Sequence, residues 1–342
     1  MKCQVLIDWL TFTVKSITDP AEVIKKYLGM DPVLFQQVDR SPLQGYQSSL
    51  RFSDICVCYD PRENEFFRDM GVCVSMSGNG CRAFETMSKL TFKGAKDKQG
   101  TESVAFPVLF QLLASDDTAN VSRIDIACDD REGYLCMDDV VRKVQDNEVN
   151  SRMTKRSVVV SFNGTQRNGS TVYIGAESSD FRVRIYDKAL EQGTDDHWIR
   201  VELVMRGKNS NAFVAQMTNS ETVGKLAAQV VNDKFSFIDR DDSNITRCTV
   251  CGWWSRFVDE LEAVRLVARC VVQHTVDQIQ NWVEGQVGPS LAILLRTKGF
   301  ACLFEVAMEA CKRLSDKQQF LIFDYNALHP QLQLDQQYCL RA

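Results

Sequence analysis

Short runs in which apolar and polar residues alternate dominate the chain up to about residue 210. Runs of this kind, rich in Val, Ile, Phe or Tyr, occur at residues 3–14, 50–59, 71–77, 122–129, 157–163, 171–175, 181–187 and 198–206. A period of two is typical of a β-strand with one buried face. The pattern therefore predicts an antiparallel sheet that is packed on one face and polar on the other.

Helical patterns lie between several of these strands. Asp19-Pro20 is a suitable helix start and Gly29 a suitable helix end, and residues 102–115 and 137–145 predict two further helices. The Gly- and Asn-containing stretch 163–169 predicts a hairpin loop. We therefore expect the α+β fold class, with an antiparallel-sheet domain and flanking helices.

The pattern becomes helical after about residue 210. Residues 221–234 and the segment from Trp253 to about Leu314 show helical periodicity, with a polar stretch at 238–247 between them. We expect two domains, an α+β domain over residues 1–245 and a smaller all-helical domain over residues 246–342. No internal repeat is visible in the sequence.

The composition limits the class of protein. A hydrophobic fraction of 44% and a charged fraction of 25% are those of a globular protein. No apolar run approaches the roughly 18 residues that span a bilayer, and no signal-peptide pattern precedes the first strand. The 13 cysteines are scattered and odd in number. We expect reduced core thiols, a cytoplasmic location and no membrane partner.

The net charge of −5 lowers the expectation of a nucleic-acid partner, because such proteins usually carry a basic surface. That surface need only be local. Residues 151–190 contain seven basic and three acidic side chains, an excess of four positive charges. The overall acidity therefore does not decide the question.

Charged residues occupy strand positions where apolar side chains are expected. Arg123, Asp125 and Asp129 share one strand face, opposite Ile124, Ile126 and Cys128. Carboxylates two positions apart on a strand face lie about 7 Å apart, a span that one divalent ion can bridge. A half-exposed antiparallel strand would show the same alternation.

Two other strands repeat this pattern. We expect Asp8 to share its face with Leu6, Leu10, Phe12 and Val14, where an acid is costly unless it is paired or binds a metal. Arg200 and Glu202 share a face in the strand at 198–206. Recurrence over three strands favours a functional site over chance exposure.

A tyrosine lies on the most basic of the strand faces. Arg182, Arg184, Tyr186 and Lys188 share one face. A phenol with a pKa of about 10 is a poor nucleophile at neutral pH. Flanking cations and a metal would favour its phenolate and would also hold a phosphate. On composition alone, an exposed basic face explains the pattern better.

The order and spacing of several motifs resemble the replication initiation factor family. This family comprises trans-acting rolling-circle initiators of plasmids and phages and is related to relaxases of conjugative elements. The resemblance extends over roughly residues 5–210. Its motifs are ID-x-LTFTV at 7–14, SGNGCRAFE at 77–85, SRIDIACDD at 122–130, TVYIGAESSDFRVRIYDK at 171–188 and WIRVEL at 198–203, and WW-x-x-F at 253–257 resembles the family's C-terminal region.

The resemblance implies a metal-dependent, sequence-specific DNA nickase and strand transferase that starts rolling-circle replication at an origin. Tyr186 would be the nucleophile, forming a 5′-phosphotyrosyl intermediate and a free 3′-OH. Tyr173 is the rival nucleophile. The family lacks a paired-histidine metal motif, and His197, His274 and His329 of this chain form no such pair.

The resemblance also implies the roles of the charged residues. The candidate ligands of Mg²⁺ or Mn²⁺ are Asp125, Asp129 and Glu202, with Asp8 as a further candidate. The candidate phosphate and DNA contacts are Arg184, Lys188, Arg200 and Arg182.

Origin DNA, as supercoiled duplex or exposed single strand, is the implied substrate, and a host helicase is an implied partner in a bacterial cytoplasm. A homodimer would supply a second tyrosine for strand closure. The helical C-terminal region would contribute packing, dimer contacts or origin specificity. The alternatives are a relaxase of a conjugative or mobilisable element, which has the same motifs, and a non-catalytic origin-binding protein.

Two further motifs each allow two interpretations. Residues 77–80, Ser-Gly-Asn-Gly, predict either a phosphate-binding backbone at a helix start or a tight turn that requires glycine, and the turn is favoured. Cys248, Cys251, Cys270 and His274 have an acceptable spacing for zinc. The resemblance supplies no zinc, however, and the stretch between them looks like a packed helix.

Overall fold

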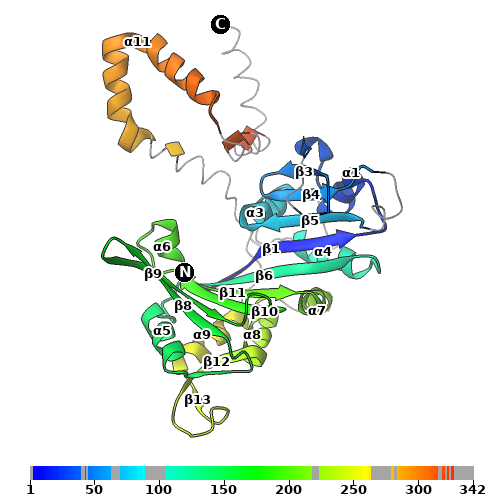
Figure 1. Ribbon diagram of the computed structural model, residues 1–342, viewed down its shortest axis with the longest axis vertical. Helices are drawn as coiled ribbons and strands as arrows, with labels where there is room; N and C mark the ends of the chain where they lie inside the picture. Colours follow the sequence, from blue (N-terminus) through cyan, green and yellow to red (C-terminus); the bar gives the residue numbers. More distant parts are fainter. Residues whose placement is uncertain are drawn as a thin grey trace, which may run out of the picture.

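The computed structural model describes residues 3–39, 43, 45–62, 70–88, 105–217, 223–262, 279–280, 283–314, 318–319, 322 and 325–326. A ten-stranded antiparallel sheet forms its main body, in the order β2-β3-β4-β5-β1-β6-β11-β10-β9-β8 (Figure 1). The central strands are β1 (Gln4–Val14) and β6 (Asn120–Asp130). The expected α+β fold class is confirmed.

The two halves of the sheet repeat one chain path. In the N-terminal half, α1 (Pro20–Val23), a π-helical turn at Ile24–Leu28 and a 3₁₀ turn at Pro32–Leu34 follow β1. Strands β2 (Gln36–Val38), β3 (Ser48–Phe52), β4 (Ile55–Tyr59) and β5 (Val72–Ser77) come next, and then α3 (Gly78–Met87) and α4 (Ala105–Ala114).

In the C-terminal half, β6 is followed by α5 (Met137–Gln145), β8 (Arg156–Asn163), β9 (Gln166–Ile174), β10 (Phe181–Asp187), α6 (Lys188–Gln192), β11 (Ile199–Arg206) and α7 (Lys208–Met217). From the centre outwards, the spatial order is β1-β5-β4-β3-β2 in one half and β6-β11-β10-β9-β8 in the other. The two halves repeat the order of their strands but not a pattern of residues. This explains why no internal repeat is visible in the sequence.

One face of the sheet is buried under helices. Side chains of β1 such as Ile7 and Leu10 and of β6 such as Ile124 belong to the same core cluster as Phe110 of α4 and Phe213 of α7. The opposite face carries polar and charged side chains. Among the described residues the expected one-sided sheet is therefore present, and the charged side chains that line a cavity on the uncovered face include Asp125 and Arg184.

Strand β1 departs from simple alternation at Asp8. Ile7 pairs with Ile126, whereas Trp9 pairs with Asp125, so Asp8 is an extra residue in the ladder. Such a β-bulge turns two successive side chains toward one face. Asp8 therefore lies beside Trp9 on the uncovered face, and the prediction that it shares a face with Leu10, Phe12 and Val14 is wrong, since these three are buried in the core.

The hairpin between β8 and β9 is tighter than predicted. The strands extend through Asn163 and resume at Gln166, so the loop is shorter than the expected 163–169. Gly164 has φ 62°, a left-handed conformation that glycine adopts without strain and that a short hairpin turn requires.

The main body extends beyond residue 245. Helix α8 (Val223–Lys234) leads into a small sheet of β7 (Val149–Ser151), β12 (Phe235–Asp239) and β13 (Thr249–Val250), and α9 (Gly252–Glu262) packs beside α8. Trp254, Phe257 and Leu261 of α9 belong to the same core cluster as the large sheet. The division between the two expected domains therefore belongs after α9 instead of near residue 245.

The described helical region beyond α9 is different. A π-helical turn at Val283–Val287 precedes α11 (Gly288–Cys311), which has a non-helical residue at Gly299 and no buried side chain. Within the described residues, no helix has both the length and the apolar character needed to cross a membrane.

We predict that Trp254→Ala lowers the free energy of unfolding by about 3–5 kcal/mol, because it empties a large, fully buried site. The Trp254 ring is 1% exposed and lies 5.0 Å from the Phe235 and Phe237 rings, centroid to centroid. The matched control is Phe300→Ala in α11, at a position that is 72% exposed. Denaturant unfolding should move by less than about 0.5 kcal/mol for this control; equal effects would contradict the placement of α9 in the core.

Candidate functional site

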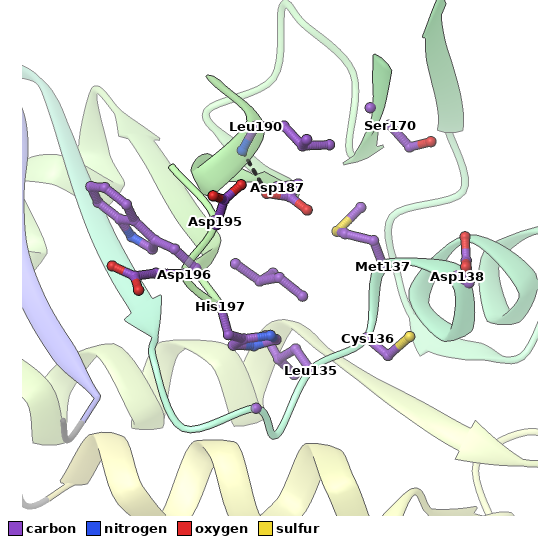
Figure 2. A pocket seen from close by; sticks show the side chains of 14 residues that line it. Leu135, Cys136, Met137, Asp138, Ser170, Asp187, Leu190, Asp195, Asp196 and His197 are labelled. Carbon is purple, nitrogen blue, oxygen red and sulfur yellow. Dashed lines mark hydrogen bonds between the residues drawn. The ribbon is translucent and has the colours of Figure 1, made fainter. Parts of the chain in front are cut away.

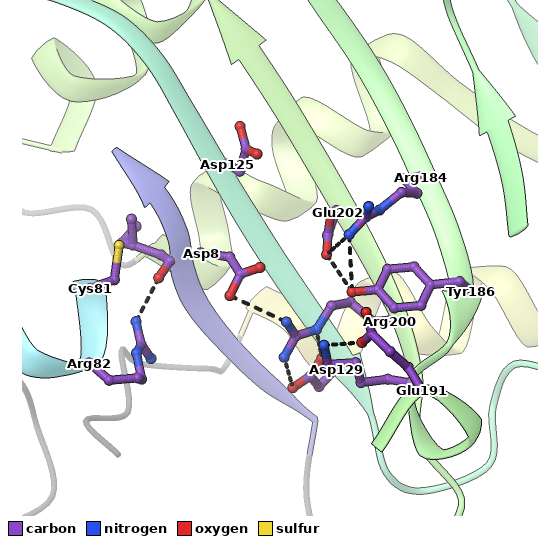
Figure 3. A network of polar contacts seen from close by, with 12 residues as sticks. Asp8, Cys81, Arg82, Asp125, Asp129, Arg184, Tyr186, Glu191, Arg200 and Glu202 are labelled. Atoms are coloured by element: carbon purple, nitrogen blue, oxygen red, sulfur yellow. Dashed lines mark hydrogen bonds and ion pairs between the residues drawn. The ribbon is translucent and has the colours of Figure 1, made fainter. Parts of the chain in front are cut away.

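Charged side chains from β1, β6, β10 and β11 meet on the uncovered face, where the two halves of the sheet join. Figure 3 shows them converging on one region. They are Asp8, Asp125, Asp129, Arg184, Arg200 and Glu202, and Tyr186 lies among them. The structure thus brings together most of the residues that the sequence singled out.

Strand register determines this convergence. Arg184 of β10 lies opposite Glu202 of β11, and Tyr186 lies opposite Arg200. On the other side of β11, Arg200 lies opposite Asp129 of β6. Directly opposite residues in antiparallel strands have Cβ atoms about 4.5–5.5 Å apart, so each of these pairs can interact through its side chains.

The Tyr186 hydroxyl is held by a carboxylate and a guanidinium. It donates a hydrogen bond to Glu202 Oε1 at 2.6 Å, and Arg184 Nη2 lies 3.3 Å from the hydroxyl and 2.8 Å from the same carboxylate oxygen. Tyr186 is 6% exposed. Glu202 is therefore placed to accept the phenolic proton.

The electrostatic balance at Tyr186 differs from the prediction. Burial and the charge of Glu202 raise the pKa of Tyr186 above its usual value, although Arg200 and Arg184 oppose the shift. The flanking cations therefore do not produce a phenolate in this structure. A reaction at this hydroxyl requires a base, and Glu202 is the group in contact with it.

Arg200 is held in place by a buried acid. Its Nε and Nη2 donate to the two oxygens of Asp129 at 2.6 and 3.0 Å, and its Nη1 lies 3.3 Å from Asp8 Oδ1. Arg200 is 4% exposed and Asp129 is fully buried. The bidentate pair fixes a positive charge beside Tyr186 instead of presenting it on an open surface.

A cavity of about 350 Å³ opens beside this network. Its lining includes the acids Asp8, Asp125 and Glu202 and the bases Arg123, Arg182, Arg184 and Arg206. Tyr173 lines it as well, with the Arg182 guanidinium 4.0 Å from its ring centroid. Tyr186 does not line the cavity, but its hydroxyl contacts Glu202 and Arg184, which do.

The acids fit a cation only in part. Within the described residues, no group of three or more His, Cys, Asp or Glu side chains has the spacing of a formed metal site. Burial raises the pKa of Asp125 against the effect of Arg123, and the charges of Glu202 and Asp8 raise it further, so the three acids interact across the cavity. Their hard oxygens are of the type that Mg²⁺ and Mn²⁺ prefer.

Asp129 does not fit the ligand role that the sequence suggested. Both of its oxygens accept from Arg200, and it does not line the cavity. Asp125 does line the cavity, but both of its oxygens accept from Arg123, at 2.9 and 2.6 Å. The Arg123 side chain is 31% exposed, so it can turn away from Asp125 more easily than Arg200 can leave Asp129.

Lys188 lies near the Tyr186 ring. It begins α6, pairs with Glu191, and its Nζ is 5.6 Å from the Tyr186 ring centroid. Next to α6 is a larger cavity of about 740 Å³ (Figure 2). Its lining includes Asp138, Asp187, Asp195 and Asp196, so it repels phosphates, and we place the phosphate-binding region on the Arg184 side.

The sequence reasoning missed Trp9 as part of the site, and it gave the helix start at residues 77–80 only as the less favoured of two interpretations. Trp9, Ser77 and Gly78 line the 350 Å³ cavity. Arg82 of α3 donates to the Ile7 carbonyl at 2.6 Å, beside the bulge that turns Asp8 and Trp9 to this face. A bulge cannot be read from one strand alone, which explains the omission.

The glycines at 78 and 80 do not form the turn that we favoured. The chain passes directly from β5 into α3 at Gly78, which lies against Asp8. Gly80 is required by close approach, because a Cβ there would lie 2.4 Å from the Asp54 carbonyl oxygen. The N-terminal end of α3 faces the cavity, where its partial positive charge favours an anion such as Asp8.

Part of the suggested zinc set, Cys270 and His274, lies outside the described residues. The two described cysteines have other partners. The Cys248 thiol donates to the Asp242 carbonyl at 3.3 Å, and the Cys251 thiol donates to Asp239 Oδ1 at 3.4 Å.

Comparisons with known proteins find similar chains. A family model described as Replication initiation factor matches residues 119–309, more than half of the chain, and one described as Rolling Circle replication initiation protein N-terminal domain matches residues 4–93. The putative DNA relaxase NicK of Bacillus subtilis (strain 168) is 24% identical over 338 residues, which cover 94% of this chain and 90% of NicK.

A solved structure is also similar. The rolling circle replication initiator protein from Geobacillus stearothermophilus matches with a TM-score of 0.67 and 27% identity, over 78% of this chain and 99% of that chain.

We predict that Asp129→Asn lowers the free energy of unfolding by about 3–5 kcal/mol, because it leaves Arg200 buried without its counter-charge. Asp125→Asn is the matched control. Its partner Arg123 reaches solvent, so the loss should stay within about 1 kcal/mol. Denaturant unfolding of both variants measures the difference. Equal destabilisation would mean that the Asp129–Arg200 pair is no more important for stability than the Asp125–Arg123 pair.

Proposed function

Because the chain belongs to the replication initiation factor family, we propose that it nicks one strand of origin DNA in a bacterial cytoplasm and so starts rolling-circle replication. One observation carries the proposal. The Tyr186 hydroxyl donates to a buried carboxylate, Glu202, at 2.6 Å and lies beside two arginines. This is the arrangement of a nucleophile, its base and charges that stabilise a phosphate.

The reaction would begin with proton transfer. Glu202 takes the phenolic proton of Tyr186 as the phenolic oxygen attacks the scissile phosphorus. A bond forms between this oxygen and phosphorus, and the bond from phosphorus to the 3′ oxygen breaks. The leaving 3′ oxygen takes up a proton from solvent, so the products are a 5′-phosphotyrosyl link and a 3′-OH that primes synthesis. Because the raised pKa keeps Tyr186 protonated, no step is available without the base.

The arginines would stabilise charge on the phosphoryl group. Arg184 contacts both the Tyr186 hydroxyl and Glu202, so its guanidinium lies next to the reacting atoms. Arg182 lines the same cavity and is a further phosphate contact. Arg200 is a positioning residue, since Asp129 and Asp8 hold all three of its guanidinium nitrogens. Lys188, near the Tyr186 ring, completes the basic surroundings.

We propose Asp8, Asp125 and Glu202 as the residues that hold a divalent ion, Mg²⁺ or Mn²⁺. When bound, the ion would neutralise charge that develops on the transferring phosphoryl group. Among the described residues, Asp8 Oδ2 and Glu202 Oε2 accept no hydrogen bond, so each acid keeps one oxygen for a cation. Asp125 would have to exchange Arg123 for the ion.

Tyr173 remains the alternative nucleophile. It lines the cavity directly, which Tyr186 does not. Tyr186 is favoured because its hydroxyl contacts a carboxylate, whereas among the described residues the Tyr173 hydroxyl has no carboxylate partner and its ring faces Arg182.

A relaxase acting in DNA transfer is the second candidate function. It is favoured by the similarity to NicK, which is described as a putative DNA relaxase and is matched over 90% of its length. Both functions use the same nicking chemistry and the same residues. They differ in the DNA element that carries the nick site.

We predict that Tyr186→Phe abolishes nicking of a supercoiled plasmid that carries the cognate origin, while binding of origin DNA changes by less than about threefold. The change removes one oxygen and leaves the ring and its packing in place. Gel electrophoresis of the plasmid and a mobility-shift titration give the two readouts. Tyr173→Phe is the matched control and should still nick; the opposite pattern would assign the chemistry to Tyr173.

We predict that a chelator stops nicking by the unaltered protein, and that Mn²⁺ or Mg²⁺ restores it, because the ion would neutralise charge that develops on the transferring phosphoryl group. Asp125→Asn should raise the ion concentration needed for half-maximal nicking at least tenfold. Titration of Mn²⁺ against the nicking rate measures this shift. Full activity in the presence of chelator would rule out the ion.

A further inference from the structure

The polar face that carries Tyr186 continues onto the N-terminal half of the sheet. Register places Thr11 of β1 opposite Ser75 of β5, Ser75 opposite Cys56 of β4, and Cys56 opposite Arg51 of β3. This polar row therefore runs from the junction of the two halves toward the outer strand β3. This row lies on the same face as the catalytic network. Trp9, two positions before Thr11 in β1, points to this face and lines the catalytic cavity.

A second cavity, of about 270 Å³, lies on this row. Its polar and aromatic lining includes one cation and one acid, and consists of Trp9, Arg51, Ser53, Asp54, Cys56, Ser75 and Ser77. Trp9 and Ser77 also line the catalytic cavity, so the two cavities share a wall. This volume is just below the usual range for ligand pockets, so it leaves room for a single base and excludes a duplex.

Trp9 is held in a defined orientation between the two cavities. Its indole Nε1 donates to Thr11 Oγ1 at 2.8 Å, and Thr11 is in turn hydrogen-bonded to Ser75 at 3.0 Å. The Arg123 guanidinium lies 4.2 Å from the indole ring centroid. Trp9 remains partly exposed. A fixed, partly exposed indole beside cations is a suitable surface for stacking a base.

Arg51 brings a positive charge to the far side of this cavity. Its guanidinium contacts the Cys56 thiol. A hydrogen bond from Cys58 and the hydrogen bond and charge of Arg51 lower the pKa of Cys56 to about 6, against the effect of burial. The cavity thus combines an aromatic surface and a cation, the two groups that bind single-stranded nucleic acid, with serine hydroxyls and the acid Asp54 in the same lining.

We propose that this second cavity binds a nucleotide of the cleaved strand next to the scissile phosphate, with its base stacked on Trp9 and its backbone phosphate held by Arg51. The proposal rests on the proposed nicking function and adds a binding site for the flanking single strand. The strand would then cross from the catalytic cavity over Ser77 and Trp9 onto the N-terminal half of the sheet. Tyr186 and Glu202 both lie in the C-terminal half of the sheet. The proposal gives the N-terminal half a role in substrate binding.

The first test measures how affinity depends on strand length. It uses Tyr186→Phe protein, which binds without cutting, and fluorescein-labelled single strands centred on the mapped nick site and lengthened on one flank at a time. We expect lengthening on one flank to strengthen binding about tenfold, the effect of one base stack, and Trp9→Ala to remove that gain. Trp9→Phe should retain most of it. An unchanged gain in Trp9→Ala would overturn the proposal.

The second test uses the unaltered aromatic site and needs no Trp9 variant. Cys56 lines the cavity and has a lowered pKa, so it should react with iodoacetamide at neutral pH. Tryptic cleavage after Arg51 and Arg62 gives one peptide, residues 52–62, that contains Cys56 and Cys58. We expect saturating single strand to slow alkylation of this peptide at least fivefold in Tyr186→Phe protein. An unchanged rate with the strand bound would contradict the proposal.

The two tests separate this proposal from the proposed function. Nicking with a tyrosine adduct, but without Cys56 protection or a Trp9-dependent gain, would overturn the nucleotide site alone. Failure of the protein to bind or cut any origin strand would overturn both. Thermal unfolding of the Trp9 variants shows whether they fold, and the alkylation test remains decisive if Trp9→Ala does not.

Discussion

Asp129 and Arg200 form an ion pair that is almost completely removed from water at the centre of the sheet. Two buried charges are tolerated only when their geometry is good and their remaining hydrogen-bonding groups are satisfied. Here two hydrogen bonds join β6 to β11, and the third guanidinium nitrogen reaches Asp8 on β1. The pair thus ties three central strands together and fixes a positive charge opposite Tyr186. The rest of the site is arranged around that charge.

The one-sided sheet explains where chemistry can occur. Helices bury one face, so charged side chains must gather on the other, and the bulge at Asp8 adds an acid and an indole to it at the junction of the halves. The two halves share one topology but not one set of side chains. The C-terminal half contributes Tyr186 and Glu202, while the N-terminal half contributes the cavity beside Trp9. One half would therefore perform the chemistry and the other would hold the strand.

Strand periodicity was enough to predict the fold class and the faces of Asp125, Tyr186 and Glu202. These properties are local, since side-chain direction alternates along a single strand. Register is not local. Nothing in one strand indicates that Tyr186 lies opposite Arg200, or that both oxygens of Asp129 are hydrogen-bonded to that arginine. The bulge at Asp8 and the packing of Trp254 on the main core also depend on partners far away in sequence. The direction of the Tyr186 pKa shift followed from burial, which the motif did not reveal.

The central claim is that Tyr186, with Glu202 as its base, forms the covalent link to DNA. The most direct test digests the protein–DNA adduct with trypsin and locates the nucleotide by mass spectrometry. Cleavage after Arg184 and Lys188 isolates Tyr186 in residues 185–188, while Tyr173 falls in residues 168–182. A nucleotide mass on 185–188 is the result that the account predicts. A nucleotide mass on 168–182 instead would contradict it.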